Sequence, residues 1–482
     1  MLKKAANISK KKAPKAPFYK YLTITLIIMS ILVLSLIYFI GVLPVDYFLF
    51  AVGLFVVIDG SLILSMNGRH KIKVIGGSLS LIFIIAMILI TIYEINTINF
   101  LKKFGYNNYF TESYLILVDK DTDYKKLTDL TNKEIGVLKT EADSKALDYL
   151  KKKLVFAETL AINNLHLITK LDKSQVAAIM IAASQLNVIK ENNPKLLADF
   201  KQIYSFEIES KETNIVKDIN ITEKPFNIYV SGIDTFGKIN SIAQSDLNLI
   251  VSVNPKTHKV QITSVPRDYY IKMDNQKAYD KLSYISLYGM ESATKAIEDL
   301  LKIEINYYLR INFNSLIEVV NAVDGIEIES NYNFTSIDEL QNPKAYTFKK
   351  GLNKLDGNEA LAFVREKKAF PAGDKTRSEN QQLILKALID EALSPSVLIN
   401  YNSLLESLND SFITNLSNEQ LADFIKKQLA SEAKWDITMT IMQGWDSTET
   451  SFTYLANKIS VVIPNLDNVK STSQNIQKLI ND

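Results

Sequence analysis

The chain has 482 residues and a net charge of +2, and 47% of its residues are hydrophobic against 22% that are charged. This length allows two or three domains, and the composition is that of an ordered globular protein with additional apolar segments. The absence of cysteine excludes disulfides, a thiolate nucleophile and cysteine-ligated zinc. Three scattered histidines are too few for a histidine-rich metal site, so any bound metal should be a hard, oxygen-liganded cation such as Mg²⁺.

Three hydrophobic runs near the start of the chain are each long enough to cross a bilayer: 21–42, 47–66 and 74–93. The middle run contains Asp59, but its apolar residues outweigh the insertion cost of roughly 3 kcal/mol for one aspartate. This run should therefore insert as well. Asp59 is then either a functional intramembrane carboxylate or a contact to a neighbouring helix.

The distribution of basic residues predicts the orientation in the membrane. Residues 1–20 hold seven lysines and no acidic residue, the loop 67–73 holds three basic residues, and the connection 43–46 holds none. Because basic segments stay in the cytoplasm, we expect 1–20 to be a cytoplasmic tail, 21–93 to form three transmembrane helices, and the large C-terminal part to be extracellular. A cleaved signal peptide is the rival interpretation, but two spanning segments would still follow it.

The segment 105–222 is predicted to be a small accessory α/β domain. Short β-like runs at 114–118 and 135–138 alternate with helical patterns at 145–154 and 175–189. The first half of this segment is faintly similar to a lobe of extracellular solute-binding proteins, although none of its residues has a recognisable ligand role. A structural role and a binding role both stay open.

The segment 225–482 is predicted to be the main domain. It begins with a buried strand, FNIYVSGID, followed by a two-stranded hairpin that ends in SVPRD. Further elements follow in chain order, with helices at 292–301, 315–323, 358–364 and 379–393, strands at 306–311, 325–329 and 435–441, more helices after 400, and a terminal helix from 468. This order is typical of an α/β or α+β domain with a central sheet flanked by helices.

Two aspartates mark one edge of this predicted sheet. Asp234 follows the first strand and Asp246 begins the next one, so both carboxylates can lie at the same rim and hold one Mg²⁺. Such an ion would neutralise charge on a diphosphate. Capping and turn formation are the alternative explanation for aspartates at strand ends.

Arginine is rare, with five residues against 50 lysines, and four of the five arginines lie between 267 and 377. The planar guanidinium suits bidentate phosphate binding, which predicts an anion site near the sheet rim, although chance placement is the alternative. Arg267 ends the hairpin, Arg365 closes a helix, and Arg377 lies in the first turn of the next helix, where free backbone amides also favour an anion. The alternative is that these arginines pair with neighbouring acids: Asp268, Glu366 and Glu379.

The ordered motifs of the main domain resemble those of the LytR-CpsA-Psr family. They are SGID, the Ser-Asp pair at 245–246, SVPRD, DKLSY, INFNSLIEVVNAVDGIEI, LDGNEALAFVRE and GDKTRSENQQ. The resemblance is strongest over 225–395, and three membrane helices followed by an accessory domain are similar to the capsule-type members of the family.

This resemblance implies a catalytic domain with an apolar tunnel for a polyprenyl chain and a diphosphate site at its mouth. By motif position, Asp234 and Asp246 would hold Mg²⁺. The implied catalytic residues are Asp246, Arg267, Arg365 and Asp374, and the implied diphosphate-binding residues are Arg267, Arg365, Lys367, Arg377 and Gln381. Lys367 stands where the family usually has arginine, so it keeps the charge but loses the planar fork.

The resemblance further implies a Mg²⁺-dependent phosphotransferase that moves a capsular or exopolysaccharide 1-phosphate from a polyprenyl-diphosphate carrier to peptidoglycan in a Gram-positive cell wall. The expected partners are the lipid-linked glycan, peptidoglycan, the membrane and capsule-assembly proteins. A polyprenyl-diphosphate phosphatase and a lipid-sensing regulator of capsule genes are the alternatives. The chain shows no helix-turn-helix pattern or zinc module, so we expect no nucleic-acid partner.

Overall fold

The computed structural model describes residues 17–41, 43–103, 109–138, 141–211, 217, 219–233, 238–273, 278–338, 344–371, 373–392, 412–417, 419–420, 423–424, 426–427, 434–454 and 457–482. The chain divides into two compact units. One comprises Met1–Phe104 with Asn418–Ala433, and the other comprises Gly105–Ser417 with Lys434–Asp482.

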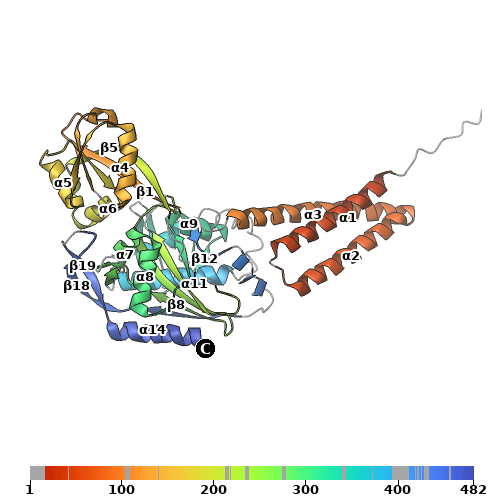
Figure 1. Cartoon of the computed structure of the whole chain (residues 1–482). Helices are drawn as coiled ribbons and strands as arrows, with labels where there is room; N and C mark the ends of the chain where they lie inside the picture. The colour runs from red at the N-terminus through yellow and green to blue at the C-terminus, as the bar shows by residue number, and fades with distance from the viewer. Residues whose placement is uncertain are drawn as a thin grey trace, which may run out of the picture. The chain divides into compact units, whose positions relative to one another are not determined.

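The first unit contains three long helices, α1 (Pro17–Ile40), α2 (Val45–Asn67) and α3 (His70–Lys103) (Figure 1). All three are long and apolar enough to cross a membrane, so the three predicted apolar helices are confirmed. A Cβ atom on Gly76 would lie 2.6 Å from Cβ of Ser65, so this glycine permits the close approach of α3 to α2. Asp59 of α2 lies close to Ser30 on α1, whose hydroxyl donates to the sulfur of Met87 on α3 at 3.4 Å, so Asp59 is next to a contact between the helices.

The second unit begins with a five-stranded sheet in the order β3-β2-β4-β1-β5. Its strands are β1 (Tyr109–Asp119), β2 (Glu134–Leu138), β3 (Ala157–Ala161), β4 (Ala178–Ala182) and β5 (Phe200–Lys211). Its helices are α4 (Glu141–Lys153), α5 (Asn164–Asp172) and α6 (Ala183–Asn192), with short 3-10 turns η1 (Leu127–Leu130) and η2 (Pro194–Leu197). We refer to this part, Tyr109–Lys211, as the accessory domain.

The helix predicted at 175–189 is wrong over its first half. Residues Ala178–Ala182 form β4, in which all five residues are buried, and α6 begins only at Ala183. A fully buried central strand is a continuous apolar run, so its sequence lacks the alternation that distinguishes a half-exposed strand from a helix.

The main domain contains a mixed six-stranded sheet in the order β16-β11-β6-β7-β8-β17. Its strands are β6 (Phe226–Ile233), β7 (Ser245–Asn254), β8 (Lys259–Ser264), β11 (Tyr307–Ile311), β16 (Phe412–Thr414) and β17 (Asp436–Ile441). The pairs β11–β6 and β8–β17 are parallel, and β6–β7, β7–β8 and β11–β16 are antiparallel. The predicted buried strand and hairpin therefore form the centre of this sheet.

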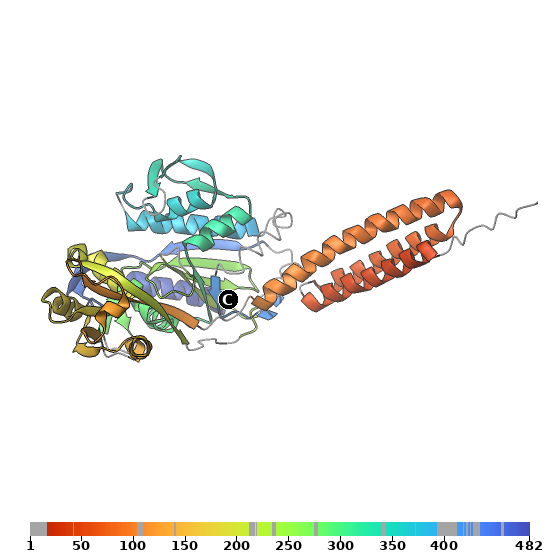
Figure 2. The same ribbon diagram turned by 90° about the horizontal axis from the view of Figure 1, so that it is seen from above.

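Helices cover both faces of this sheet (Figure 2). The helices are α7 (Leu282–Ile285), α8 (Met290–Leu301), α9 (Phe313–Ala322), α10 (Gly357–Arg365), α11 (Asp374–Ala392) and α14 (Leu466–Asn481), with a 3-10 turn η3 (Ser286–Tyr288). On one face, Ile250 packs with Ile297 of α8 and Ile476 of α14 in a buried core. On the other, the amide of Gln382 in α11 donates to the backbone oxygen of Thr440 in β17 at 2.8 Å. The predicted α/β class with a helix-flanked central sheet is confirmed.

Four two-stranded ribbons extend the domain. They pair β9 (Tyr270–Met273) with β10 (Ala278–Lys281), β12 (Ile326–Ser330) with β15 (Gly351–Leu355), β13 (Phe334–Asp338) with β14 (Lys344–Phe348), and β18 (Gly444–Thr450) with β19 (Lys458–Pro464). The strand predicted at 325–329 thus belongs to a ribbon and not to the central sheet. Most of the helices predicted after residue 400 lie outside the described residues.

The accessory domain packs directly on the main domain. Ile189 of α6 belongs to a buried apolar cluster that also contains Tyr284 of α7 and Val461 of β19. The backbone of Thr111 in β1 is also bonded to the main domain, because its N–H donates to the oxygen of Asn240 and its oxygen accepts from Ile242 N–H. This contact fixes α6 against the part of the main domain that carries the candidate site.

Candidate active site

Asp246 occupies a bulge between β6 and β7. Gly232 faces Leu247 and Ile233 faces Ser245, so Asp246 is the extra residue on β7. Such a bulge redirects one side chain out of the regular alternation, and bulges are over-represented next to active sites. A Cβ atom on Gly232 would lie 2.7 Å from Cβ of Leu247, which explains why glycine is needed at this point of the SGID motif.

A buried polar network supports the bulge from below. The hydroxyls of Ser231 and Ser245 lie 2.8 Å apart, and the N–H of Ser245 donates to the hydroxyl of Ser286 at 2.9 Å. The amide of Asn248 donates to the oxygen of Ser245, while its own side-chain oxygen accepts from the Tyr229 hydroxyl. Because each of these groups has a partner, the network fixes the backbone on both sides of Asp246.

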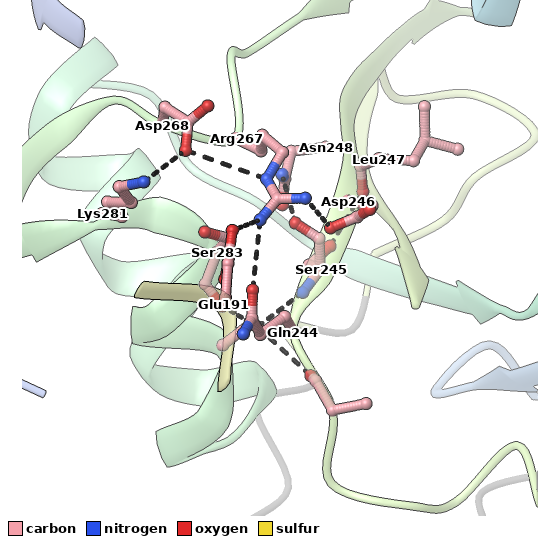
Figure 3. Close-up of polar contacts among 12 residues, drawn as sticks. Glu191, Gln244, Ser245, Asp246, Leu247, Asn248, Arg267, Asp268, Lys281 and Ser283 are labelled. Carbon is pink, nitrogen blue, oxygen red and sulfur yellow. Dashed lines mark hydrogen bonds and ion pairs between the residues drawn. The ribbon is translucent and has the colours of Figure 1, made fainter. Parts of the chain in front are cut away.

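Arg267 lies beside this bulge, in the turn that follows β8 (Figure 3). Its Nη1 donates to Oδ1 of Asp246 at 2.5 Å, and its Nη2 donates to Glu191 at 3.0 Å and to Gln244 at 3.1 Å. Nε lies 3.8 Å from Oδ1 of Asp268. The guanidinium therefore faces three carboxylates. The backbone oxygen of Arg267 accepts a hydrogen bond from Ser283 N–H, which holds the turn against α7.

Neighbouring opposite charges shift the pKa values of Arg267 and Asp268. Desolvation lowers the pKa of Arg267, but the carboxylates of Asp246, Asp268 and Glu191 outweigh it and hold this pKa above its ordinary value. Desolvation likewise raises the pKa of Asp268, but Lys281, with Nζ 3.0 Å from Oδ1, and the charge of Arg267 hold it below its usual range. Arg377 adds to this lowering, so α11 brings a further cation toward the same carboxylate.

The structure brings only some of the predicted site residues together. Asp246 and Arg267 are in direct contact, and the positive charge of the buried Arg377 lowers the pKa of the neighbouring Asp268. Arg365, the last residue of α10, places its guanidinium 4.6 Å from the centroid of the Phe313 ring. Its charge therefore covers an aromatic face.

The remaining predicted residues are less informative. Lys367 is exposed after the end of α10, and Gln381 is partly buried on α11. Asp374 is the first residue of α11, but its side chain is not among the described ones, and Asp234 lies outside the described residues.

Three site residues were missed in the sequence: Glu191, Gln244 and Lys281. Gln244 and Lys281 lie beside or within the motifs that carry the family resemblance, so their positions offered a signal. Glu191 belongs to the accessory domain, 76 residues before Arg267, and nothing in its local sequence distinguishes it.

The fit of Mg²⁺ rests on Asp246. Within the described part of the chain, no group of three or more His, Cys, Asp or Glu side chains could hold a metal ion. However, Mg²⁺ in phosphate-transfer sites is usually bound through one or two carboxylates, with water and substrate oxygens completing its shell. Asp246 uses Oδ1 for Arg267, and its side chain is 20% exposed at the rim, so it fits this minimal role.

Comparison with known families gives these residues a context. The model of the LytR_cpsA_psr family matches residues 198–474, more than half of the chain. The chain belongs to the LytR-CpsA-Psr family. The match begins two residues before β5, so most of the accessory domain lies outside it, and it includes the bulge, the Arg267 turn, α10 and α11.

The similar proteins include transferases of the cell wall. The chain is 32% identical over 231 residues to the polyisoprenyl-teichoic acid–peptidoglycan teichoic acid transferase TagU of Enterococcus faecalis, spanning 47% of this chain and 74% of the relative. It is 29% identical over 201 residues to the corresponding transferase TagV of Bacillus subtilis, which covers 41% of this chain and 51% of that protein. Among solved structures, B. subtilis TagV matches 54% of this chain and 98% of its own, with 25% identity and a TM-score of 0.45.

Proposed function

We propose that this protein is a membrane-anchored phosphotransferase that moves a glycan 1-phosphate from a polyprenyl-diphosphate carrier to peptidoglycan. The observation that carries the proposal is the direct contact of Arg267 with Asp246 at the β6–β7 bulge, with Lys281 and Arg377 acting on the adjacent Asp268. Guanidinium and ammonium groups gathered around one carboxylate-lined rim suit an anionic, oxygen-rich substrate. The teichoic acid transferases among the relatives support the same reaction class.

The reaction joins two hydroxyl-bearing partners through one phosphorus. A peptidoglycan hydroxyl attacks the sugar-proximal phosphorus, its new P–O bond forms, and the bond from that phosphorus to the bridging oxygen breaks, releasing polyprenyl phosphate. Arg267 and Arg377 bind and orient the diphosphate oxygens, while Asp246 or Asp374 accepts the hydroxyl proton. Such transfer depends mainly on positioning and charge neutralisation, so no covalent nucleophile is needed.

Magnesium is part of this proposal. Asp246, together with Asp234, would hold the ion at the rim, where it would neutralise charge on the diphosphate. If Asp246 is a ligand, Asp246→Asn should weaken Mg²⁺ binding in calorimetric titrations. The matched change Asp446→Asn, at an exposed position of β18, should leave binding unchanged.

The proposal also includes the membrane topology of the protein and the kind of glycan that it transfers. Three spanning helices and the basic segments at 1–20 and 67–73 support a multi-pass membrane protein whose C-terminal part lies outside the cell. The relatives are teichoic acid transferases, whereas this chain carries an accessory domain that lies mostly outside the family match. On that difference we favour a capsular or exopolysaccharide, with capsule-assembly proteins as partners. The polyprenyl chain is expected to occupy an apolar tunnel in the main domain.

The decisive experiment uses the full chain in detergent with Mg²⁺, a polyprenyl-diphosphate-linked glycan and purified peptidoglycan. A transferase releases polyprenyl phosphate and yields wall-linked glycan, whereas a phosphatase yields free glycan. Arg267→Ala should abolish release, while Lys302→Ala, an exposed cation of the same domain, should not. Chemically defined capsular and teichoic donors supplied side by side identify the preferred glycan.

Two further outcomes would contradict the proposal. Donor binding without turnover in the presence of acceptor, with altered capsule transcription on deletion of residues 3–15 in a correctly inserted chain, would favour the regulator. A complete lack of donor binding would contradict both the transferase and the regulator.

A further inference from the structure

Glu191 reaches the candidate site from a different domain. It lies near the C-terminal end of α6, and its Oε1 accepts from Nη2 of Arg267 at 3.0 Å (Figure 3). Its Oε2 accepts from the Tyr284 hydroxyl at 3.2 Å. The amide of the next residue, Asn192, donates to the same hydroxyl at 2.7 Å. Both carboxylate oxygens are therefore engaged by main-domain groups.

This contact is fixed by the domain interface. Ile189, two residues before Glu191, belongs to the buried cluster that joins α6 to Tyr284 and β19, and Asn192 is tied back to the oxygen of Val188 at 2.8 Å. The helix end is thus anchored on both sides of Glu191. Without this anchoring, ordering the long side chain of Glu191 would cost rotational entropy, while a partly exposed ion pair contributes little free energy in return.

The charge count at the site changes with Glu191. Three carboxylates, Glu191, Asp246 and Asp268, surround Arg267, Lys281 lies 3.0 Å from Asp268, and the charge of Arg377 also acts on Asp268. The formal charge of these six groups sums to zero. Without Glu191 the same group would carry +1. Nη2, the guanidinium nitrogen not used by Asp246, donates to both Glu191 and Gln244. A phosphate oxygen that approaches Nη2 from the side of the accessory domain takes the place of the Glu191 carboxylate, whose negative charge, unlike the neutral Gln244 amide, competes with the phosphate.

We propose that Glu191 is a positioning residue of the accessory domain that holds Nη2 of Arg267 until the donor diphosphate replaces it. The inference rests on the proposed function. The carboxylate keeps the guanidinium oriented along the rim between turnovers and competes with bound phosphate, so it weakens the binding of donor and of the polyprenyl phosphate product alike. A product with fewer phosphate oxygens loses this competition more readily, which assists its release.

The test compares the full chain with Glu191→Gln, in detergent with Mg²⁺, using farnesyl diphosphate and farnesyl phosphate as probes. Glu191→Gln keeps the shape and the hydrogen bond from Tyr284 but removes the charge. A partly exposed ion pair is worth up to about 1 kcal/mol, so the Kd of both probes should fall by about two- to fivefold. With a farnesyl-diphosphate-linked glycan as donor and peptidoglycan as acceptor, the KM for release of farnesyl phosphate should fall in parallel, while kcat stays the same or decreases.

The matched control is Glu158→Gln, because Glu158 is another accessory-domain acid in an ion pair, with a side chain 41% exposed against 40% for Glu191. It should change neither Kd nor KM. Glu191→Asp keeps the charge but draws it back by one methylene, so it should also lower the Kd, by less. Higher Kd values in the Glu191 variants, or values equal to those of the control, would overturn the inference. Absence of probe binding in the unaltered chain would instead reject the proposed function.

Discussion

The stability of the accessory domain depends on pH because the domain contains a buried acid, Glu112. Burial raises the pKa of Glu112 on β1 from 4.5 to about 7, although its hydrogen bonds with the Ser184 hydroxyl, at 2.6 Å, and with the Ser184 N–H lower it, and the charge of Asp143 raises it further. The folded domain therefore binds a proton at Glu112 under conditions in which the unfolded chain has lost it. The contribution of Glu112 to the stability of the domain is therefore fully present below pH 4.5 and is lost as the pH rises through 7.

The size of the effect follows from the two pKa values. A difference of 7 − 4.5 = 2.5 corresponds to about 3 kcal/mol between the acidic and the alkaline limit, since each pKa unit is 1.36 kcal/mol. Glu112→Gln keeps an acceptor for the Ser184 hydroxyl but does not titrate. The variant should therefore match the unaltered protein below pH 4.5 and be more stable by up to about 3 kcal/mol at pH 8.

Hydrogen exchange of the β1 amides in the full chain measures this difference. After correction for intrinsic exchange, protection in the unaltered protein should fall by about 100-fold between pH 4.5 and 8, and it should stay constant in Glu112→Gln. Glu209→Gln, at an exposed position of the neighbouring strand β5, should retain the fall. Constant protection in the unaltered protein, or an unchanged fall in Glu112→Gln, would refute the assignment of the proton to Glu112.

Three further predictions concern the candidate site and its support. Arg267→Lys should weaken the binding of farnesyl diphosphate by at least about tenfold in titrations, because lysine keeps the charge but loses the planar fork, with a charge-assisted hydrogen bond worth about 1.5–3 kcal/mol. Gly232→Ala should cost about 1–3 kcal/mol in chemical unfolding and also lower turnover, since its Cβ would force Leu247 and the bulge apart. Asp280→Ala should destabilise the main domain by about 1–3 kcal/mol in the same assay, because it leaves the buried Ser451 hydroxyl, now 2.8 Å from the carboxylate, without this acceptor.

The fold could be predicted where local patterns are strong. The three spans, the central hairpin and the amphipathic helices α8 and α10 have lengths and periodicities that few other structures share. The ribbon β13–β14 and the strand β4 could not be predicted, since short or wholly buried strands carry no distinctive period. Their pairing is decided by tertiary packing, as with β12, which joins β15 outside the central sheet.

Arginine scarcity was a useful guide to the site but not a specific one. It predicted Arg267 and Arg377, whose charges both act on Asp268, yet the same stretch contains Arg310, which is almost fully buried. Its guanidinium lies 5.0 Å from the centroid of the Phe110 ring, and its Nη2 donates to the backbone oxygen of Ser241. The planar, always charged group that suits phosphate also suits a buried contact between domains, so rarity alone cannot separate these uses.

The backbone around Asp246 differs from the one that the sequence pattern suggested. The sequence pattern predicts Asp246 at the start of a strand, where a carboxylate also serves as a cap or turn residue. In the structure it is the additional residue of a bulge, made possible by Gly232 opposite and fixed by the serine network below. A bulge depends on the register of two strands, which is a property of the pair. The same dependence on a distant partner applies to Glu191: because Arg267 is held from the accessory domain, the function of that domain has to be sought first in the chemistry of the main one.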